Sequence, residues 1–227
     1  MPEQDRKRNP FLIEHANLDD KIYARVKALI ADGALPPGQR TLQEKLAREM
    51  GVSRTPLVNA LKRLAQERLV EWVFCHGVYV MRFTMREMAQ LFEAREGLEP
   101  MAARLAANRI VPAEVRRFQR MFGGVGTRPS AADVRRYPAC DREFHWRLVE
   151  LTENPHLAAA RESVNMMISA YQVGVRRSSA ESLPEHRAIP EALGRRDPDT
   201  SEAAMRVHSR RSVQRLWQRA RAEDAKR

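Results

Sequence analysis

The stretch that most constrains the fold is A-R-E-M-G-V-S-R-T-P at residues 47–56. One helical pattern runs up to Gly51, and a second starts at Ser53. Glycine adopts backbone conformations that are costly for other residues, and serine is favoured at the start of a helix. Ala47 is small enough for two helices to cross closely, and Val52 fills the corner between them. The stretch therefore predicts a helix-turn-helix.

The two helices on either side of this turn can be bounded from their caps. Thr41 and Glu44 have the spacing of a capping box, so the first of the two is expected to start at Thr41 and to end at Gly51. Leu42, Leu46 and Met50 then follow at helical spacing. The second helix is expected to start at the Ser53 cap, with proline tolerated in its first turn. Its inward stripe is Leu57, Ala60, Leu61 and Leu64.

Flanking segments predict another helix and a hairpin. Apolar residues on one face predict a helix from Leu18 to Asp32, with Ile22, Val26, Leu29 and Ile30 as that face. Residues 71–82 are rich in strand formers, with a tight turn at His76 and Gly77 and alternating valines after it. This hairpin is expected to form the wing of a winged helix-turn-helix.

Beyond Phe83 the pattern is helical nearly throughout. Breaks are expected at Pro112, at residues 123–129, at Asn154-Pro155, near Pro184 and at Asp197-Pro198. They leave about six helices, enough for an all-α bundle. The predicted fold is mainly α, with a mobile arm at residues 1–15, a winged helix-turn-helix domain at 16–83 and an all-α domain at 84–227.

Composition narrows the partners and the compartment. The formal net charge of +11 and pI near 10.4 favour a polyanion such as nucleic acid, an acidic membrane surface or a phosphorylated ligand. Cys75 and Cys140 are too few for a disulfide framework or a four-thiolate zinc site, so we expect them to be packing residues. The chain has no apolar run long enough to span a membrane and no signal-peptide core. We therefore expect a cytoplasmic protein without a membrane partner.

The start of the second helix of the turn is the expected DNA-reading surface. The first turns of such a helix enter the major groove, so Arg54 can bond a guanine edge, and Ser53 and Thr55 can contact phosphate or base. Asn59 can bond an adenine edge or serve a structural role on the helix surface. The secondary candidates are Arg40 and the wing residues His76 and Gly77.

From the L-P-P-G turn at 35–38 through T-L-Q-E-K-L-A, G-V-S-R-T-P and the H-G pair at 76–77, this half resembles the winged helix-turn-helix of the GntR family of bacterial transcription regulators. The resemblance implies binding to double-stranded operator DNA. One departure is Val58-Asn59, where the family usually has Arg-Glu. A common DNA-contacting arginine is therefore absent, and the operator sequence cannot be transferred from other members.

Asp141 and His145 are one helical turn apart, so both lie on one face of a helix. The stripe continues through Leu148, which points this face into the bundle, and a divalent metal would neutralise the buried carboxylate. Taken singly, each histidine fits a hydrogen-bonded core or surface residue as well as a ligand. The same half, however, resembles the FCD effector domain of the fatty-acid-regulator branch of GntR proteins, in which an Asp and a His on one helix are joined by two later histidines. The residues that match this motif are Asp141, His145, His186 and His208, with N-P-H-L at 154–157 as further support. The resemblance implies a divalent metal, for which we expect zinc or nickel.

Arg95 is a charge on the apolar stripe of the first helix of this half. Related effector pockets commonly have an arginine in this E-x-R context, which implies that Arg95 binds a small carboxylate effector. The alternative is an internal ion pair with Glu99, one turn later. Arg211 and Arg215 are weaker candidates for the same role.

These features favour a ligand-responsive transcription regulator that acts as a homodimer, because one winged domain reads too short a site. An alternative is a metal-dependent hydrolase or lyase that the helix-turn-helix tethers to DNA. The sequence contains no nucleophile and base at recognisable spacing and no phosphate loop, so we expect no enzyme activity. A nonspecific architectural DNA-binding protein is a third interpretation.

Overall fold

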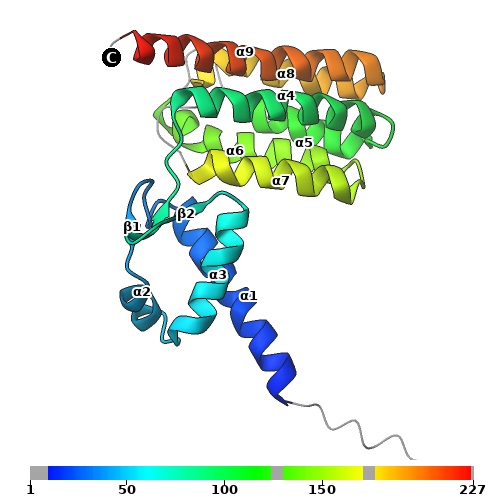
Figure 1. The fold of residues 1–227 in the computed structure, drawn as a ribbon. Helices are drawn as coiled ribbons and strands as arrows, with labels where there is room; N and C mark the ends of the chain where they lie inside the picture. Colours follow the sequence, from blue (N-terminus) through cyan, green and yellow to red (C-terminus); the bar gives the residue numbers. More distant parts are fainter. Residues whose placement is uncertain (1–9, 124–129, 171–176, 226–227) are drawn as a thin grey trace, which may run out of the picture. The chain divides into compact units, whose positions relative to one another are not determined.

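The computed structural model of the chain describes residues 10–123, 130–170 and 177–225, with side chains over 18–123, 130–168 and 177–225. The described residues up to Arg82 form one compact unit, and those from Phe83 to Ile168 and from 177 to 225 form a second. The boundary lies between Arg82 and Phe83, beside the expected one. As predicted, the fold is mainly α, with a winged helix-turn-helix followed by an all-α unit (Figure 1).

The first unit combines three helices with a small antiparallel sheet. The helices are α1 (Pro10–Ala31), α2 (Gln43–Glu49) and α3 (Arg54–Gln66), and the strands are β1 (Arg40–Thr41), β2 (Val70–Val73) and β3 (Gly77–Val80). Strand β3 lies between the other two, and Val78 is paired with Thr41 on one side and Trp72 on the other. The predicted core stripes are confirmed in Ile22, Val26 and Ile30, in the four α3 positions, and in Val78 and Val80, all of which are buried.

The turn at Gly51 has the geometry that the sequence predicts. Gly51 has φ +66°, in the left-handed region. Its N–H donates to the carbonyl of Arg48 at 3.1 Å, and the N–H of Val52 donates to that of Ala47 at 3.0 Å. These two bonds form a Schellman motif, which satisfies carbonyls at the end of α2. The glycine therefore ends one helix and directs the chain into the next.

Two predicted helix starts are wrong. Thr41 does not cap α2, because it lies in β1 opposite Val78 and is buried. Residue Leu42 is the N-cap instead, is exposed, and makes no side-chain capping bond. Helix α1 begins at Pro10 rather than Leu18, so residues 10–15 of the expected arm are helical. The rest of that arm, residues 1–9, lies outside the described part of the chain.

The cysteines differ in their surroundings. Cys140 packs against the core of the second unit, as expected. Cys75 does not, because it occupies the exposed turn between β2 and β3 with a left-handed φ of 58°.

All regular elements among the described residues of the second unit are helices. Its helices are α4 (Met85–Ala107), α5 (Pro112–Gly123), α6 (Ala131–Glu150), α7 (Pro155–Ala170), α8 (Ser179–Gly194) and α9 (Pro198–Asp224). Helices α4 and α9 pack side by side, and α8 packs on α9 and α5 (Figure 1). The predicted break near Pro184 is wrong, since α8 runs through both Pro184 and Pro190. Within the described residues, no helix is both long and apolar enough to cross a membrane.

Aromatic side chains lie at the centre of the core of this unit. Phe144 meets Phe118 and Phe122 edge to face, with ring centroids 4.8 Å and 5.3 Å apart. The ring of His186 stacks on Phe122 at 4.6 Å. The apolar core therefore packs directly against His186, one of the candidate metal ligands from the sequence.

Candidate metal centre and DNA-reading surface

The four side chains proposed as ligands converge in the second unit. Helix α6 supplies Asp141 and His145, α8 supplies His186 and α9 supplies His208. Their potential ligand atoms all lie within 4.8 Å of one another. Asp141 Oδ1 is 3.1 Å from His186 Nε2 and 3.7 Å from His145 Nε2, and the two Nε2 atoms are 3.4 Å apart. Two donors about 2.1 Å from one ion at a tetrahedral angle lie roughly 3.4 Å apart, so these separations fit a shared cation.

Local sequence fixes the helices that carry these ligands. Helices α6 and α8 start in capping boxes, in which Ser130 pairs with Asp133 and Ser178 with Glu181. At the start of α9, Asp197 accepts bonds from two backbone N–H groups. Each cap satisfies N–H groups that would otherwise lack partners, so each helix begins at a defined residue. The side chains of the ligands are therefore aimed from fixed helices.

The outer nitrogen of each histidine faces an oxygen. These contacts are His145 Nδ1 to Glu99 Oε1 at 3.2 Å, His208 Nδ1 to Glu185 Oε2 at 3.5 Å and His186 Nδ1 to the Ser182 carbonyl at 3.2 Å. A carboxylate only accepts, so Glu99 and Glu185 favour the tautomers of neutral His145 and His208 that carry the proton on Nδ1. The Nε2 atom of each of these two rings then keeps its lone pair, the form in which imidazole binds a metal.

The candidate ligand atoms of the cluster therefore include the Asp141 carboxylate and the unprotonated nitrogens of His145 and His208. Burial lowers the pKa of His208 to about 3 and lowers the pKa of His145, so both rings are neutral near pH 7. Burial raises the pKa of Asp141, but contact with His186, His145 and Arg95 holds it well below its ordinary value. An ionised carboxylate and neutral ring nitrogens repel one another at these distances. A cation between them reverses that repulsion, so the residues fit a divalent metal ion.

A cavity of about 390 Å³ opens beside this cluster. Asp141 and His208 line it, and so does Arg95 from α4. Its remaining walls mix other arginines with serines, Asn165 and apolar side chains. A metal held by the cluster would thus face a space large enough for a small organic molecule.

Arg95 makes the ion pair that was the alternative to effector binding. Its Nε donates to Glu99 Oε1 at 2.6 Å, and both side chains are largely buried. The pair does not remove Arg95 from the cavity, because its side chain still lines the wall. Arg211 and Arg215 instead bond the carboxylates of Glu185 and Glu181.

In the first unit, the residues predicted to read DNA lie at the exposed start of α3. Ser53 has the extended backbone of an N-cap, although its side chain makes no capping bond. Arg54 and Thr55 are exposed. Arg54 Nε donates to Gln43 Oε1 on α2 at 3.1 Å, which leaves the two terminal nitrogens of the guanidinium to reach a base or phosphate.

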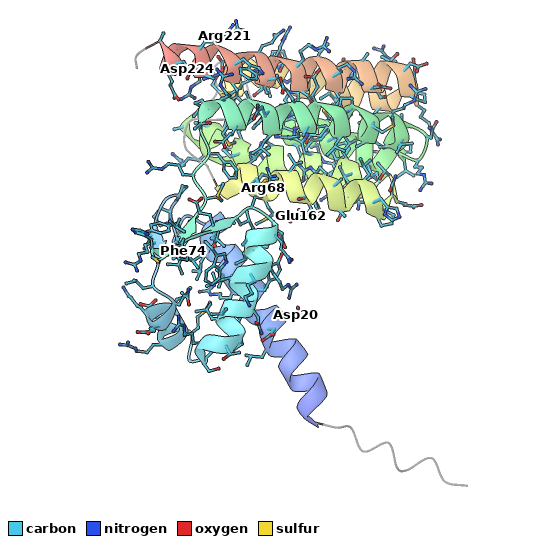
Figure 2. The ribbon with its side chains drawn as sticks, in the orientation of Figure 1. Asp20, Arg68, Phe74, Glu162, Arg221 and Asp224 are labelled. Carbon is cyan, nitrogen blue, oxygen red and sulfur yellow. The ribbon has the colours of Figure 1, made fainter. Side chains whose placement is uncertain are left out.

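Arg40 and the wing residues lie together at one end of the sheet. A Cβ placed on Gly77 would be 3.5 Å from Arg40 Nε, so the guanidinium runs along the hairpin turn. His76 Nδ1 lies 2.8 Å from the carbonyl of Phe74 within that turn. The Phe74 ring itself is almost fully exposed at the hairpin (Figure 2).

Asn59 lies on the side of α3 that faces α1. Its Nδ2 donates to Asp19 Oδ2 at 3.4 Å, and Arg63 on the next turn pairs with Asp20 at 2.7 Å. These contacts favour the structural role over adenine readout.

Comparison with known proteins assigns the chain to a family. The FCD domain matches residues 90–211, more than half of the chain, and the model of the bacterial regulatory proteins of the gntR family matches residues 18–80. The chain belongs to the GntR family. It is a DNA-binding transcriptional regulator of the GntR/FCD type, and neither family nor relatives are enzymes, which removes the hydrolase or lyase alternative.

The relatives of this GntR-family protein include two that are named as operon regulators. The Nta operon transcriptional regulator of Aminobacter aminovorans is 31% identical and aligns over 76% of this chain and 81% of its own. A probable D-xylose utilization operon transcriptional repressor of Paenarthrobacter nicotinovorans is 26% identical over 79% and 80%. Among solved structures, E. coli McbR/YncC has a TM-score of 0.70 at 19% identity, covering 89% of this chain and 98% of that one. That structural likeness supports the fold.

Several contacts of the GntR-family site were not predicted from the sequence. Glu99 was expected only as a partner of Arg95, and it also faces His145. Glu185, which pairs with Arg177 and faces His208, was not predicted. Burial raises the pKa of each carboxyl, but the cationic and imidazole neighbours lower it by more. The pKa of Glu99 is therefore well below its ordinary value, and the pKa of Glu185 is about 2. Both are therefore ionised.

Tyr137 and Arg161 complete the unpredicted set. Tyr137 Oη lies 2.7 Å from His186 Nδ1 and 2.8 Å from Ser182 Oγ. Its position one turn before Asp141 on α6 is a signal that helical spacing offered. Arg161 has no such signal, because only the packing of α7 brings it to Glu99.

Proposed function

We propose that this GntR-family regulator binds operator DNA as a homodimer, and that a small organic acid bound beside a divalent metal in the FCD domain modulates its operator affinity. FCD domains bind metals in some cases, and this chain has a His/Asp cluster suited to one. The observation that carries the proposal is the convergence of Asp141 Oδ1 with the Nε2 atoms of His145 and His186 at 3.1–3.7 Å.

Zinc or nickel is the metal that we propose for this donor set. Imidazole nitrogen is a preferred ligand of both ions, and one carboxylate supplies a negative charge. The carboxylates behind His145 and His208 make the ring nitrogens more basic, as second-layer partners of metal sites commonly do.

The effector would reach the metal from the cavity. Asp141 and His208 line that space, so a carboxylate in it can occupy an open coordination position, and Arg95 stands on the same wall to pair with it. The ligand would favour one arrangement of the bundle helices, and the spacing of the two recognition helices in the dimer would follow. A dimer is proposed because two winged domains related by a two-fold axis match a palindromic operator.

Elemental analysis with native mass spectrometry tests the metal site, on protein purified without a metal-affinity tag. We expect about one divalent ion per chain in a dimer, because four ligands form one site. His145→Ala should lose the ion and still bind operator DNA, since α3 belongs to the other unit. His156→Ala is the matched control, because His156 is exposed on α7, and it should keep the ion.

Full metal occupancy in His145→Ala would exclude His145 as a ligand. A wild-type chain that takes up no zinc, nickel or manganese would remove the metal from the proposal and leave the four residues as core packing.

A further inference from the structure

Arg161 on α7 is a buried cation with an unused donor. Its side chain is 3% exposed and lines the 390 Å³ cavity. Among the described residues, its Nε has no hydrogen-bond partner. Its Nη2 lies 3.5 Å from Glu99 Oε1, longer than a hydrogen bond of normal strength. A buried donor without a partner is costly, which indicates that something else bonds it.

Glu99 cannot compensate Arg161 fully. Its Oε1 accepts from Arg95 Nε at 2.6 Å and faces His145 Nδ1 at 3.2 Å, so one carboxylate is shared by two buried guanidinium groups and an imidazole. Burial lowers the pKa of Arg161 despite Glu99, as expected for a cation whose charge is only partly balanced. One positive charge is left over on this wall of the cavity.

The rest of the wall shows the same excess. The charged residues that line the cavity are Arg95, Arg142, Arg161, Arg177 and Asp141. Arg177 is neutralised by Glu185, to which it donates at 2.6 Å and 3.0 Å. Asp141 belongs to the candidate metal site, where an ion of charge two would more than cancel it. With the ion bound, the cavity therefore attracts more than one negative charge.

The cavity also offers apolar surface between these charges. Its apolar lining includes Phe92, Val134, Tyr137, Pro138 and Ile168. A hydrocarbon body would bury itself there, whereas a small hydroxylated or inorganic anion would leave this surface without a partner. Arg161 and His145 both lie near Glu99 Oε1, so an anion bound at Arg161 would lie a short distance from the candidate metal site.

We propose that the effector is a dicarboxylic acid with a hydrocarbon body, and that Arg161 binds the carboxylate that does not face the metal. This inference rests on the proposed function, because it takes the metal and Arg95 to hold the first carboxylate. Arg161 then determines specificity for diacids over monoacids, through charge-assisted bonds to the second group.

Isothermal titration calorimetry on the full-length, zinc-loaded protein tests this with matched pairs, in which diacids from succinate to suberate are compared with monoacids of the same chain length. At least one diacid should bind ten-fold or more tightly than its monoacid. Arg161→Met should weaken binding of that diacid to the affinity of its monoacid and leave the affinity for the monoacid unchanged. Arg161→Lys should recover part of the preference for the diacid. Zinc content and circular dichroism establish that each variant is folded and loaded.

Arg142→Met is the control, because Arg142 lines the same cavity but is exposed. This variant should change the affinities for both acids of a pair by a similar, small factor. Equal binding of every diacid and its monoacid, or a loss of preference in Arg142→Met but not in Arg161→Met, would overturn the assignment while the proposed function stands. Failure of all acids to bind zinc-loaded protein would instead overturn the effector part of the proposed function as well.

Discussion

At the scale of single residues, the carboxylates behind the histidines orient the site. Glu185 Oε2 lies 3.5 Å from His208 Nδ1 and is itself paired with Arg177, so its charge favours the tautomer that frees Nε2. Glu185→Gln removes the charge and retains the shape. We expect metal affinity to fall about 10–100-fold, the usual effect of losing a second-layer partner. Competition with a chromogenic chelator measures this.

Glu191→Gln serves as the comparison, because Glu191 is an exposed residue of the same helix. It should leave the metal affinity unchanged. If the two variants behaved alike, Glu185 would have no role in orienting His208.

DNA reading also depends on one side chain at this scale. Arg54 is exposed at the start of α3, with its Nε fixed on Gln43 and its terminal nitrogens available. Arg54→Ala should cost about 1–3 kcal/mol of operator binding and leave metal content intact. Fluorescence anisotropy with operator and random duplexes at one salt concentration measures the loss.

Arg120→Ala separates base reading from overall charge, because it also removes one positive charge but from an exposed site in the other unit. An equal loss in both variants would assign Arg54 to nonspecific attraction. An operator bound no more tightly than random DNA would favour an architectural protein.

Residues were predictable from the sequence where spacing on one helix carried the information. Asp141 and His145 share a turn of α6, and Arg54 follows a cap, so their placement could be inferred. The contacts of Glu99 with His145, of Glu185 with His208 and of Arg161 with Glu99 join different helices, and no spacing within one segment encodes them. The spacing on single helices therefore indicated candidate ligands and the Arg95–Glu99 pair, but not the contacts between helices.

At the scale of elements, the turn between α2 and α3 depends on Gly51. A Cβ at this position would meet nothing within 4 Å, so substitution costs conformational energy alone. Gly51→Ala should destabilise the fold by about 1–2 kcal/mol, the cost of a left-handed conformation for a residue with a Cβ. Urea unfolding followed by circular dichroism measures the change.

Gly97 provides the opposite case, since it lies exposed inside α4 with equally open space around it. Gly97→Ala should stabilise the protein by about 0.5–1 kcal/mol, because alanine loses less freedom in a helix. Two changes of the same sign would mean that backbone conformation does not decide the effect at Gly51.

Helix ends were harder to predict than helices, because local signals compete with longer-range ones. Thr41 does not form the expected capping box, because it pairs with Val78 in the sheet and its side chain is buried there. Helix α8 starts at the Ser178–Glu181 capping box and continues through Pro184, so a proline inside the pattern was not enough to end it.

At the scale of the whole molecule, regulation requires that binding at the ligand site and binding at the DNA-reading surface are energetically coupled. These lie in different units of the chain, so an effect of one on the other must pass through a change in the population of states. Thermodynamic linkage makes such coupling reciprocal. If an acid changes operator affinity by some factor, saturating operator must change the affinity for that acid by the same factor, typically about 5–150-fold.

Calorimetric titration of the acid into zinc-loaded protein, with and without an operator duplex, measures the effect of the operator on acid affinity. Anisotropy with and without the acid measures the effect of the acid on operator affinity. His145→Ala should bring both factors to one, because it removes a proposed ligand of the metal, whereas His156→Ala should leave them equal and unchanged. Identical acid affinity with and without operator would refute population shift as the mechanism, even for an acid that binds the cavity tightly.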